Sequence, residues 1–176
     1  CSSDLTVDTK KLCDVLRNEE HSHLSYVINL VSNKIGLHCK RVAQLCAYIA
    51  KANNLTTEQQ KNVYYAGLYH DIGKIYELAA QVEHCELGFN ILSQFNELKD
   101  AALIVKDHHK RFDDQNAGQI SKEAKILAVV DYFDKVVNKE KKDDEVQRTL
   151  ADIIGEMMAE KGKKFDPERS EEHTSE

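Results

Sequence analysis

Apolar residues recur along most of the chain at the three- and four-residue spacing of an amphipathic helix. The pattern predicts helices over residues 4–17, 24–31, 57–70, 82–95, 98–109, 121–137 and 145–160, and another from a turn at Asn33 and Gly36 to about Asn53. Thr57 with Gln60 is typical of a capping box, and Ser121 of an N-cap. With no internal repeat and no convincing strand, the sequence predicts an all-α fold, a single compact multi-helix bundle.

Composition limits the classes of protein that fit. The chain has 176 residues, of which 41% are hydrophobic and 31% charged, so it is long enough for one domain with a real core. Seven glycines and one proline are too few for a fold rich in turns and strands. A formal net charge of −6 argues against a dedicated nucleic-acid-binding surface, although it leaves an anionic substrate open.

The cysteines and the chain ends set expectations about cellular context. Five cysteines without a C-x-x-C pair indicate reduced thiols in a cytoplasmic protein. No apolar run approaches the ~20 residues of a membrane span. Because the chain begins at Cys1, we expect a fragment whose upstream sensor or receiver domain is missing. Residues 169–176 resemble the translation of a sequencing adapter, so we expect a truncated or artefactual tail over residues 166–176. The rest of the chain is predicted to comprise an N-terminal helix and linker (1–23) and one domain (24–165).

Candidate chemistry lies on helix faces that should be buried. The sequence Tyr69-His70-Asp71-Ile72-Gly73-Lys74 ends an apolar run, and burying an unpaired carboxylate costs several kcal/mol unless it is paired or binds a metal. Seven such polar residues lie on or at the end of apolar faces: His38, His70, Asp71, His84, His108, His109 and Asp131. Imidazole and carboxylate suit divalent transition metals, and seven donors fit two metals better than one, with Asp71 as the candidate bridge.

Each of these residues also has a purely structural interpretation. His38 alone on an apolar stripe is typical of a core histidine, and His84 of a surface residue at a helix start. The pair His108-His109 suits a helix C-terminus because of the macrodipole. Asp131 is alternatively exposed, with Asp134 as the buried carboxylate.

Together the motifs resemble the HD superfamily of metal-dependent phosphohydrolases. The resemblance rests on His38 with Arg41-Val42, the His70-Asp71-Ile72-Gly73-Lys74 segment, His84, His108-His109, and Ala128-Val129-Val130-Asp131-Tyr132-Phe133-Asp134. It covers roughly residues 35–137 and is greatest to the HD-GYP branch, the bacterial cyclic di-GMP phosphodiesterases. This resemblance implies an HD-domain bundle with a metal site between its central helices.

The resemblance also implies a role for each matching residue. One metal would be held by His38, His70, Asp71 and Asp131, and the second by His84, His108 and His109, with Asp71 shared. Asp71 and Lys74 are the implied catalytic residues, and Lys74 would contact the substrate phosphate or protonate the leaving group. Alternatively, the positive charge of Lys74 only complements the end of a helix. Arg111 suits a phosphate, or else is a solvated loop cation. The two divalent ions are expected to be iron or manganese, with zinc or nickel as alternatives.

Two family elements are absent, and they concern the substrate. Residues 110–118 stand where the Gly-Tyr-Pro motif is expected, and residues 138–142 where an Arg-Pro-Tyr-Arg-like element is expected. We therefore predict a hydrolase for a phosphodiester of a nucleotide or a cyclic dinucleotide resembling cyclic di-GMP. The alternatives are a degenerate HD-GYP-like signalling or binding module without efficient turnover, and a structural helical domain with incidental histidines.

Overall fold

The computed structural model describes residues 33–75, 83–115, 119–138 and 149–167. The elements in order are α3 (Asn33–Ala52), α4 (Thr57–Tyr69), the 3-10 turn η1 (Ile72–Ile75), α6 (His84–Leu92), η2 (Asn96–Leu98), α7 (Lys99–Asp107), α8 (Lys122–Val137) and α9 (Leu150–Ala159). Within these ranges the only β interaction is an isolated bridge between Lys161 and Phe165, so the predicted all-α class is confirmed. Among the same residues, no helix has the length and apolar composition to cross a bilayer.

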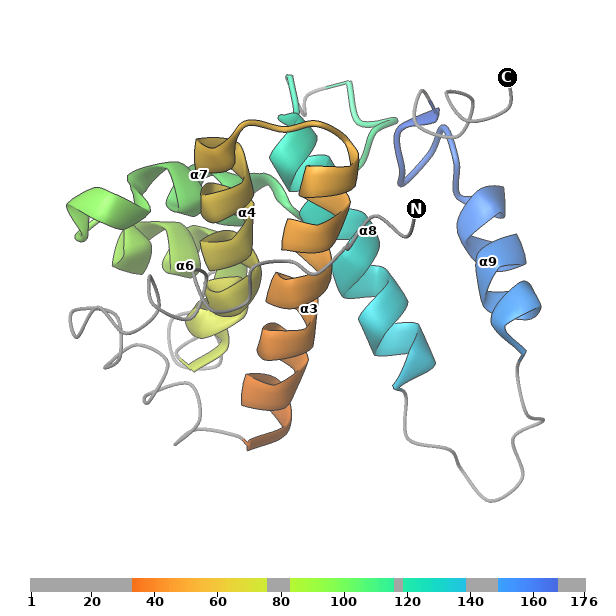
Figure 1. Cartoon of the computed structure of the whole chain (residues 1–176), viewed down its shortest axis with the longest axis horizontal. Coiled ribbons are helices and arrows are strands. Elements are labelled where there is room, and N and C mark those ends of the chain that lie inside the picture. Colours follow the sequence, from red (N-terminus) through yellow and green to blue (C-terminus); the bar gives the residue numbers. More distant parts are fainter. Residues whose placement is uncertain (1–32, 76–82, 116–118, 139–148, 168–176) are drawn as a thin grey trace, which may run out of the picture.

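Helix α3 runs through the middle of the bundle (Figure 1). It packs against α4 on one side and α8 on the other, and α4 in turn packs against α7. Helices α6 and α7 pair with each other beyond α4, and η1 contacts α6. Consequently the C-terminal end of α4, the start of α6 and the end of α7 meet near the middle of α8.

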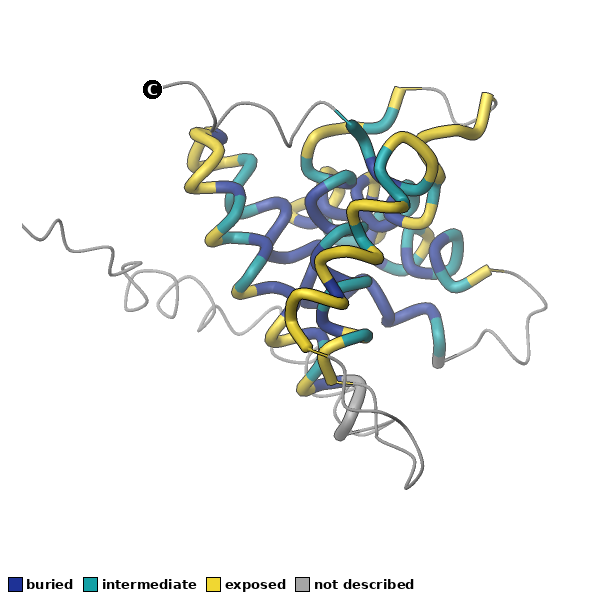
Figure 2. Tube along the Cα trace, turned by 90° about the vertical axis from the view of Figure 1, so that its right-hand side faces the viewer, coloured by how far each residue is buried: buried dark blue, intermediate teal, exposed yellow. Residues whose placement is uncertain are grey.

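Buried apolar side chains hold these helices together. Val42, Val63, Leu92, Val105 and Leu127, from five different helices, are each fully buried. Figure 2 shows buried positions gathered in the interior and exposed positions along the outer helix faces. All five belong to one hydrophobic cluster, and burying one such side chain contributes roughly 1.5–3 kcal/mol to the stability of the bundle.

Two helix starts test the capping predictions. The capping box of α4 is formed by Thr56 and Gln59, so the predicted pair Thr57 and Gln60 is wrong by one residue. Two successive threonines both satisfy the sequence rule, and only the extended backbone of Thr56 decides between them. The prediction for α8 is confirmed, because the Ser121 side chain accepts a hydrogen bond from the Ala124 N–H.

Other boundaries differ from the predicted ones. Gly36 lies inside α3, so the turn predicted there is wrong. The helix predicted over 98–109 ends at Asp107, with His108 as its C-cap. The last helix begins at Leu150 after a capping box at Thr149, later than the predicted residue 145. The helices predicted over 4–17 and 24–31, and most of the predicted tail, lie outside the described residues.

Two glycines near the C-terminal end of α4 allow neighbouring elements to approach closely. A Cβ on Gly67 would lie 2.8 Å from Ala43 Cα, so only glycine permits this crossing of α3 and α4. A Cβ on Gly73 would lie 2.0 Å from the carbonyl oxygen of His84. Glycine at 73 therefore brings the start of α6 directly against η1, which follows Asp71.

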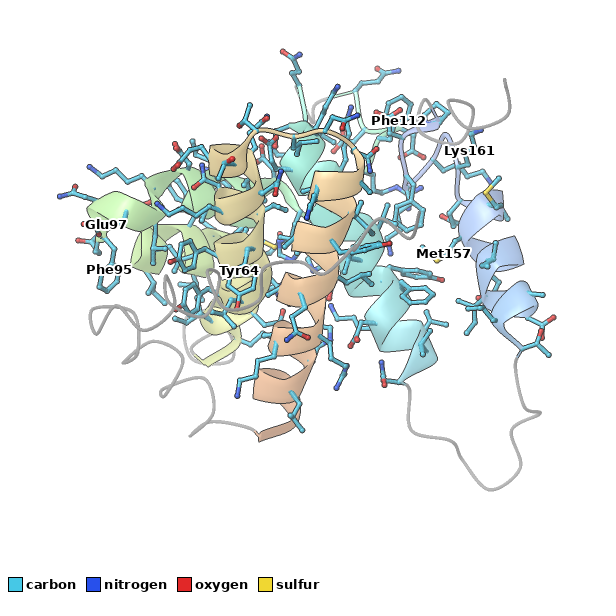
Figure 3. All side chains as sticks on the ribbon, in the orientation of Figure 1. Tyr64, Phe95, Glu97, Phe112, Met157 and Lys161 are labelled. Carbon is cyan, nitrogen blue, oxygen red and sulfur yellow. The ribbon has the colours of Figure 1, made fainter. Side chains whose placement is uncertain are left out.

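An apolar cavity of about 460 Å³ lies between α9 and the rest of the bundle. Leu45, Ile49, Phe133 and Met157 line it, and Met157 lies on the side of α9 that faces α8 (Figure 3). None of the seven predicted ligand residues lines this cavity. This cavity is therefore separate from the candidate metal-binding residues.

Candidate metal centre

Five histidine rings from four helices form one continuous group. His38 comes from α3, His70 caps α4, His84 begins α6, and His108 caps α7 with His109 following. Ring centroids are 5.1 Å apart for His38 and His70, 5.4 Å for His70 and His108, 3.9 Å for His108 and His109, and 5.0 Å for His109 and His84. Residues separated by up to 71 positions in the sequence (109 − 38) thus converge on one place.

The first donor cluster joins α3, α4 and α8. His38 Nε2 lies 3.0 Å from Asp131 Oδ1 and 3.2 Å from His70 Nε2. His70 Nε2 also lies 3.2 Å from Asp131 Oδ1. Two imidazole nitrogens and one carboxylate oxygen therefore face a common point.

The second donor cluster joins α6 to the end of α7. His84, Cys85, His108 and His109 each offer one ligand atom, and these four atoms lie within 4.8 Å of one another. The Cys85 Sγ is 3.7 Å from His84 Nε2 and 3.7 Å from His108 Nδ1. This group has the imidazole donors that the sequence predicted, with one thiol added.

Asp71 lies between the two clusters. Its Oδ1 is 3.4 Å from His70 Nε2 and 3.8 Å from His84 Nε2, and its Oδ2 is 3.9 Å from His38 Nε2. Lys74 Nζ donates to Oδ2 at 2.7 Å. One carboxylate therefore reaches both donor groups, as a bridging ligand must.

Outer hydrogen bonds fix how three of the imidazoles point. The Nδ1–H groups of His70 and His108 donate to the carbonyl oxygens of Gly67 at 2.9 Å and Val105 at 2.6 Å. His38 Nδ1–H donates to Asp134 at 2.7 Å. Each of these bonds occupies the Nδ1 of its ring and leaves Nε2 as the nitrogen available to a metal, which is the arrangement of metal-ligating histidines.

Asp134 is itself held by Arg41. The guanidinium Nε and Nη2 donate to the two carboxylate oxygens at 2.7 Å each, a bidentate pair. Because Asp131 and Asp134 are both buried, the interpretation that left Asp131 exposed is wrong. The sequence did not single out Asp134 or Arg41 for this role, although each follows a predicted ligand by three residues, the spacing of neighbours on a helix.

Two buried polar atoms lack hydrogen-bond partners in the described part of the chain, namely Asp71 Oδ1 and His108 Nε2. A buried unsatisfied group costs roughly 1–3 kcal/mol. Asp71 Oδ1 lies 3.4 Å from His70 Nε2, and His38 Nε2 and His70 Nε2 lie 3.2 Å from each other. Divalent cations would satisfy all of these lone pairs, so the residues fit the metals that the sequence predicted. The donor set admits iron, manganese, zinc and nickel.

Charges within the centre are strongly coupled. Burial works against ionisation of Asp71, but the charges of His70 and Lys74 hold its pKa well below the usual range. Burial likewise opposes the protonated form of His70, but Asp71 and Asp131 raise its pKa well above 6.5. Burial lowers the pKa of His108 well below 6.5 and that of His109 to about 4, so both rings are neutral, as ligands must be.

The remaining predicted site residues differ in their surroundings. Lys74 reaches the centre through Asp71, as described above. Arg111 is exposed and donates to the two oxygens of Asp113 at 2.8 and 2.9 Å. Its predicted contact with phosphate stays a prediction. Cys85 was not among the predicted ligands, but it is buried beside His84 and His108. Its position next to His84 in the sequence was the available signal.

The HD domain family profile matches residues 35–136, well over half of the chain. The chain therefore belongs to the HD domain family. This agrees with the resemblance inferred from the motifs, and the matched range contains all seven predicted ligand residues.

Among curated proteins, the chain is similar to the cyclic di-GMP phosphodiesterase response regulator RpfG of Xanthomonas campestris pv. campestris, with 26% identity over 172 residues, 85% of this chain and 45% of that protein. It is 28% identical to the cyclic di-GMP phosphodiesterase of Thermotoga maritima over 154 residues, 74% of this chain and 41% of that one. It is 30% identical to ribonuclease Y of Mycoplasma capricolum over 129 residues, 73% of this chain and 22% of that one. The chain thus spans less than half the length of these relatives.

Proposed function

We propose that this chain is a metal-dependent phosphohydrolase that cleaves a phosphodiester of a nucleotide or a cyclic dinucleotide. The observation that carries the proposal is the position of Asp71, whose carboxylate lies within 3.9 Å of imidazole nitrogens from both donor clusters. A binuclear site needs such a carboxylate, because two cations at ~3.5–4 Å repel each other unless an anion lies between them.

The residues divide the work. His38, His70 and Asp131 would hold one ion, and His84, His108 and His109 the other, with Asp71 shared. When bound, the ions supply Lewis acidity and lower the pKa of water. Lys74 lies 2.7 Å from Asp71, which sets its ammonium at the edge of the centre, where it contacts a phosphate oxygen or gives a proton to the leaving oxygen.

The substrate class follows from charge and from the relatives. The chain has a net charge of −6, but the site itself has Lys74 and Lys135 within 2.7 Å of its carboxylates. Both lysines offset the carboxylates of the centre, so bound divalent cations would leave the site locally positive and attract an anionic substrate despite the overall charge. Two of the relatives are cyclic di-GMP phosphodiesterases and one is a ribonuclease, and all three names describe cleavage of phosphodiesters.

A second function is a binding module that retains metals but turns over poorly. It is favoured by residues 110–118, which lack the Gly-Tyr-Pro motif that the family resemblance leads one to expect. Under this alternative the metal centre orders a nucleotide without efficient hydrolysis.

Turnover separates the two functions. The protein is loaded with manganese or iron and assayed with cyclic di-GMP and with bis(p-nitrophenyl) phosphate, beside Asp71→Ala and the control Asp100→Ala, which changes an exposed carboxylate on α7. We expect metal-dependent hydrolysis by the wild type and the control, and loss of roughly a hundredfold or more in Asp71→Ala. Metal binding with no turnover of either substrate would favour the binding module. Full activity of Asp71→Ala would overturn the proposed role of the bridge.

A further inference from the structure

A small cationic pocket opens beside the metal centre. Its volume is about 80 Å³, and three lysines line it, Lys110, Lys135 and Lys164, together with the ring of Tyr132. His108, His109 and Asp131 form the wall that it shares with the metal centre. Three ammonium groups around one opening are unusual in a chain whose acidic residues outnumber its basic ones, 30 to 24.

The three lysines differ in how far their charge is already neutralised. Lys110 Nζ pairs with Asp107 at 2.8 Å, and Lys135 Nζ with Asp131 at 2.7 Å. Lys164 makes no salt bridge within the described residues and lies over aromatic rings, 4.2 Å from the Tyr132 centroid and 5.6 Å from that of Phe165. The rings hold the Lys164 ammonium in place without cancelling its charge, so it is the group most ready to bind an anion.

The size of the pocket limits its ligand. A cavity needs about 10–15 Å³ of space to hold one water molecule, so the pocket has room for several heavy atoms. Sites for whole drug-sized ligands measure roughly 300–1,000 Å³. The pocket therefore accommodates a phosphoryl group but excludes a nucleoside.

The pocket lies beside the metal centre rather than over it. Asp71 and Lys74, which mark the point between the two donor clusters, do not line it. Under the proposed function, the phosphate undergoing cleavage would lie beside Asp71, the residue shared by the two donor clusters. An anion in the pocket is accordingly a different group of the same substrate.

We propose that the pocket binds a second, non-reacting phosphate of the substrate, with Lys164 as its principal contact. This rests on the proposed function and narrows it to substrates with at least two phosphates, such as a cyclic dinucleotide or a dinucleotide with a 5′-phosphate. Lys135 and Lys110 add charge at the same opening, where residues 110 and 135 flank the family motifs but do not belong to the implied ligand set.

The test compares two dinucleotides that differ by one phosphate, guanylyl-guanosine with and without a 5′-phosphate. Their binding to the metal-loaded protein is measured by calorimetry for the wild type, Lys164→Met and Lys163→Met. Lys163 is an exposed neighbour that does not line the pocket, so its variant has the same charge change at a different place. We expect the wild type and Lys163→Met to bind the 5′-phosphorylated form roughly tenfold more tightly, and Lys164→Met to lose this preference, because one charge-assisted hydrogen bond is removed.

Equal affinity of the wild type for the two dinucleotides would overturn the proposed phosphate-binding role of the pocket. A preference for the 5′-phosphorylated form that Lys164→Met retains would overturn it as well. A binding measurement keeps this result separate from the proposed function. If the wild type shows the Lys164-dependent preference but hydrolyses neither cyclic di-GMP nor bis(p-nitrophenyl) phosphate, the hydrolase proposal fails and the pocket stands. If hydrolysis occurs without the preference, the pocket alone fails.

Discussion

Replacing Gly73 by alanine should damage both the fold and the metal centre. The new Cβ would lie 2.0 Å from the His84 carbonyl oxygen, 2.8 Å from the His84 carbonyl carbon and 2.9 Å from Gly88 N. All three are backbone atoms, so no side-chain rotation relieves the contacts. Restoring an ordinary separation of 3.4 Å from the carbonyl oxygen requires a shift of about 1.4 Å, the difference between the two distances.

This shift would separate α6 from η1, and hence His84 from Asp71. Overpacking of this kind costs roughly 1–3 kcal/mol of stability. A misplacement of about 1 Å in a catalytic centre lowers activity by about a hundredfold. We therefore expect Gly73→Ala to unfold at lower urea concentration than the wild type, and to retain less metal on the side of the centre formed by His84.

The matched control is Gly155→Ala. Gly155 lies within α9, and no heavy atom within 4 Å would meet its new Cβ. Alanine there should raise the free energy of unfolding by up to about 1 kcal/mol, because glycine is the poorer helix former. Urea denaturation and metal analysis of both variants give the comparison. Wild-type stability together with full metal content in Gly73→Ala would refute the reasoning.

Three further predictions concern packing, orientation and protonation. Gly67→Ala places a Cβ 2.8 Å from Ala43 Cα and should reduce the free energy of unfolding, measured by urea denaturation, by roughly 1–3 kcal/mol. An unchanged urea midpoint would contradict the close approach of α3 and α4 at this position. Asp134→Asn weakens the hold on His38 Nδ1–H and should raise the metal dissociation constant at least about tenfold in chelator competition, whereas an unchanged constant would remove its orienting role. Because the pKa of His70 is raised, metal binding must displace its proton. The affinity for the metal should therefore rise by up to about tenfold per pH unit until the pH exceeds that pKa, and calorimetry in two buffers should detect the released proton. A metal affinity that does not change with pH would contradict this prediction.

The sequence predicted the helices because their apolar spacing reflects burial, and burial is what the structure shows. Val42 and Val63 are fully buried on the faces where the pattern placed them. The ends were less predictable, because several residues satisfied the same local rule. Thr56 and Thr57 are both acceptable caps, and backbone geometry alone selects Thr56.

The candidate site was predictable where a polar residue stood out on an otherwise apolar helix face. His70 and Asp131 stood out because buried polar groups require partners. The partners that orient the ligands did not stand out. Asp134 and Arg41 pair across a sequence separation of 93 residues, and neither is unusual on a partly exposed helix. Likewise Lys164 reaches the site from beyond α9, a path that no local pattern indicates.

The most direct test of a bridged, two-metal centre is the metal content of the purified chain. Mass spectrometric metal analysis after loading with manganese, iron or zinc, and removal of excess metal, gives the number of bound ions per chain. The account predicts two ions per chain in the wild type, and at most one in Asp71→Ala, provided that circular dichroism shows both proteins folded. One ion or none in the folded wild type, or two ions retained in Asp71→Ala, would contradict it.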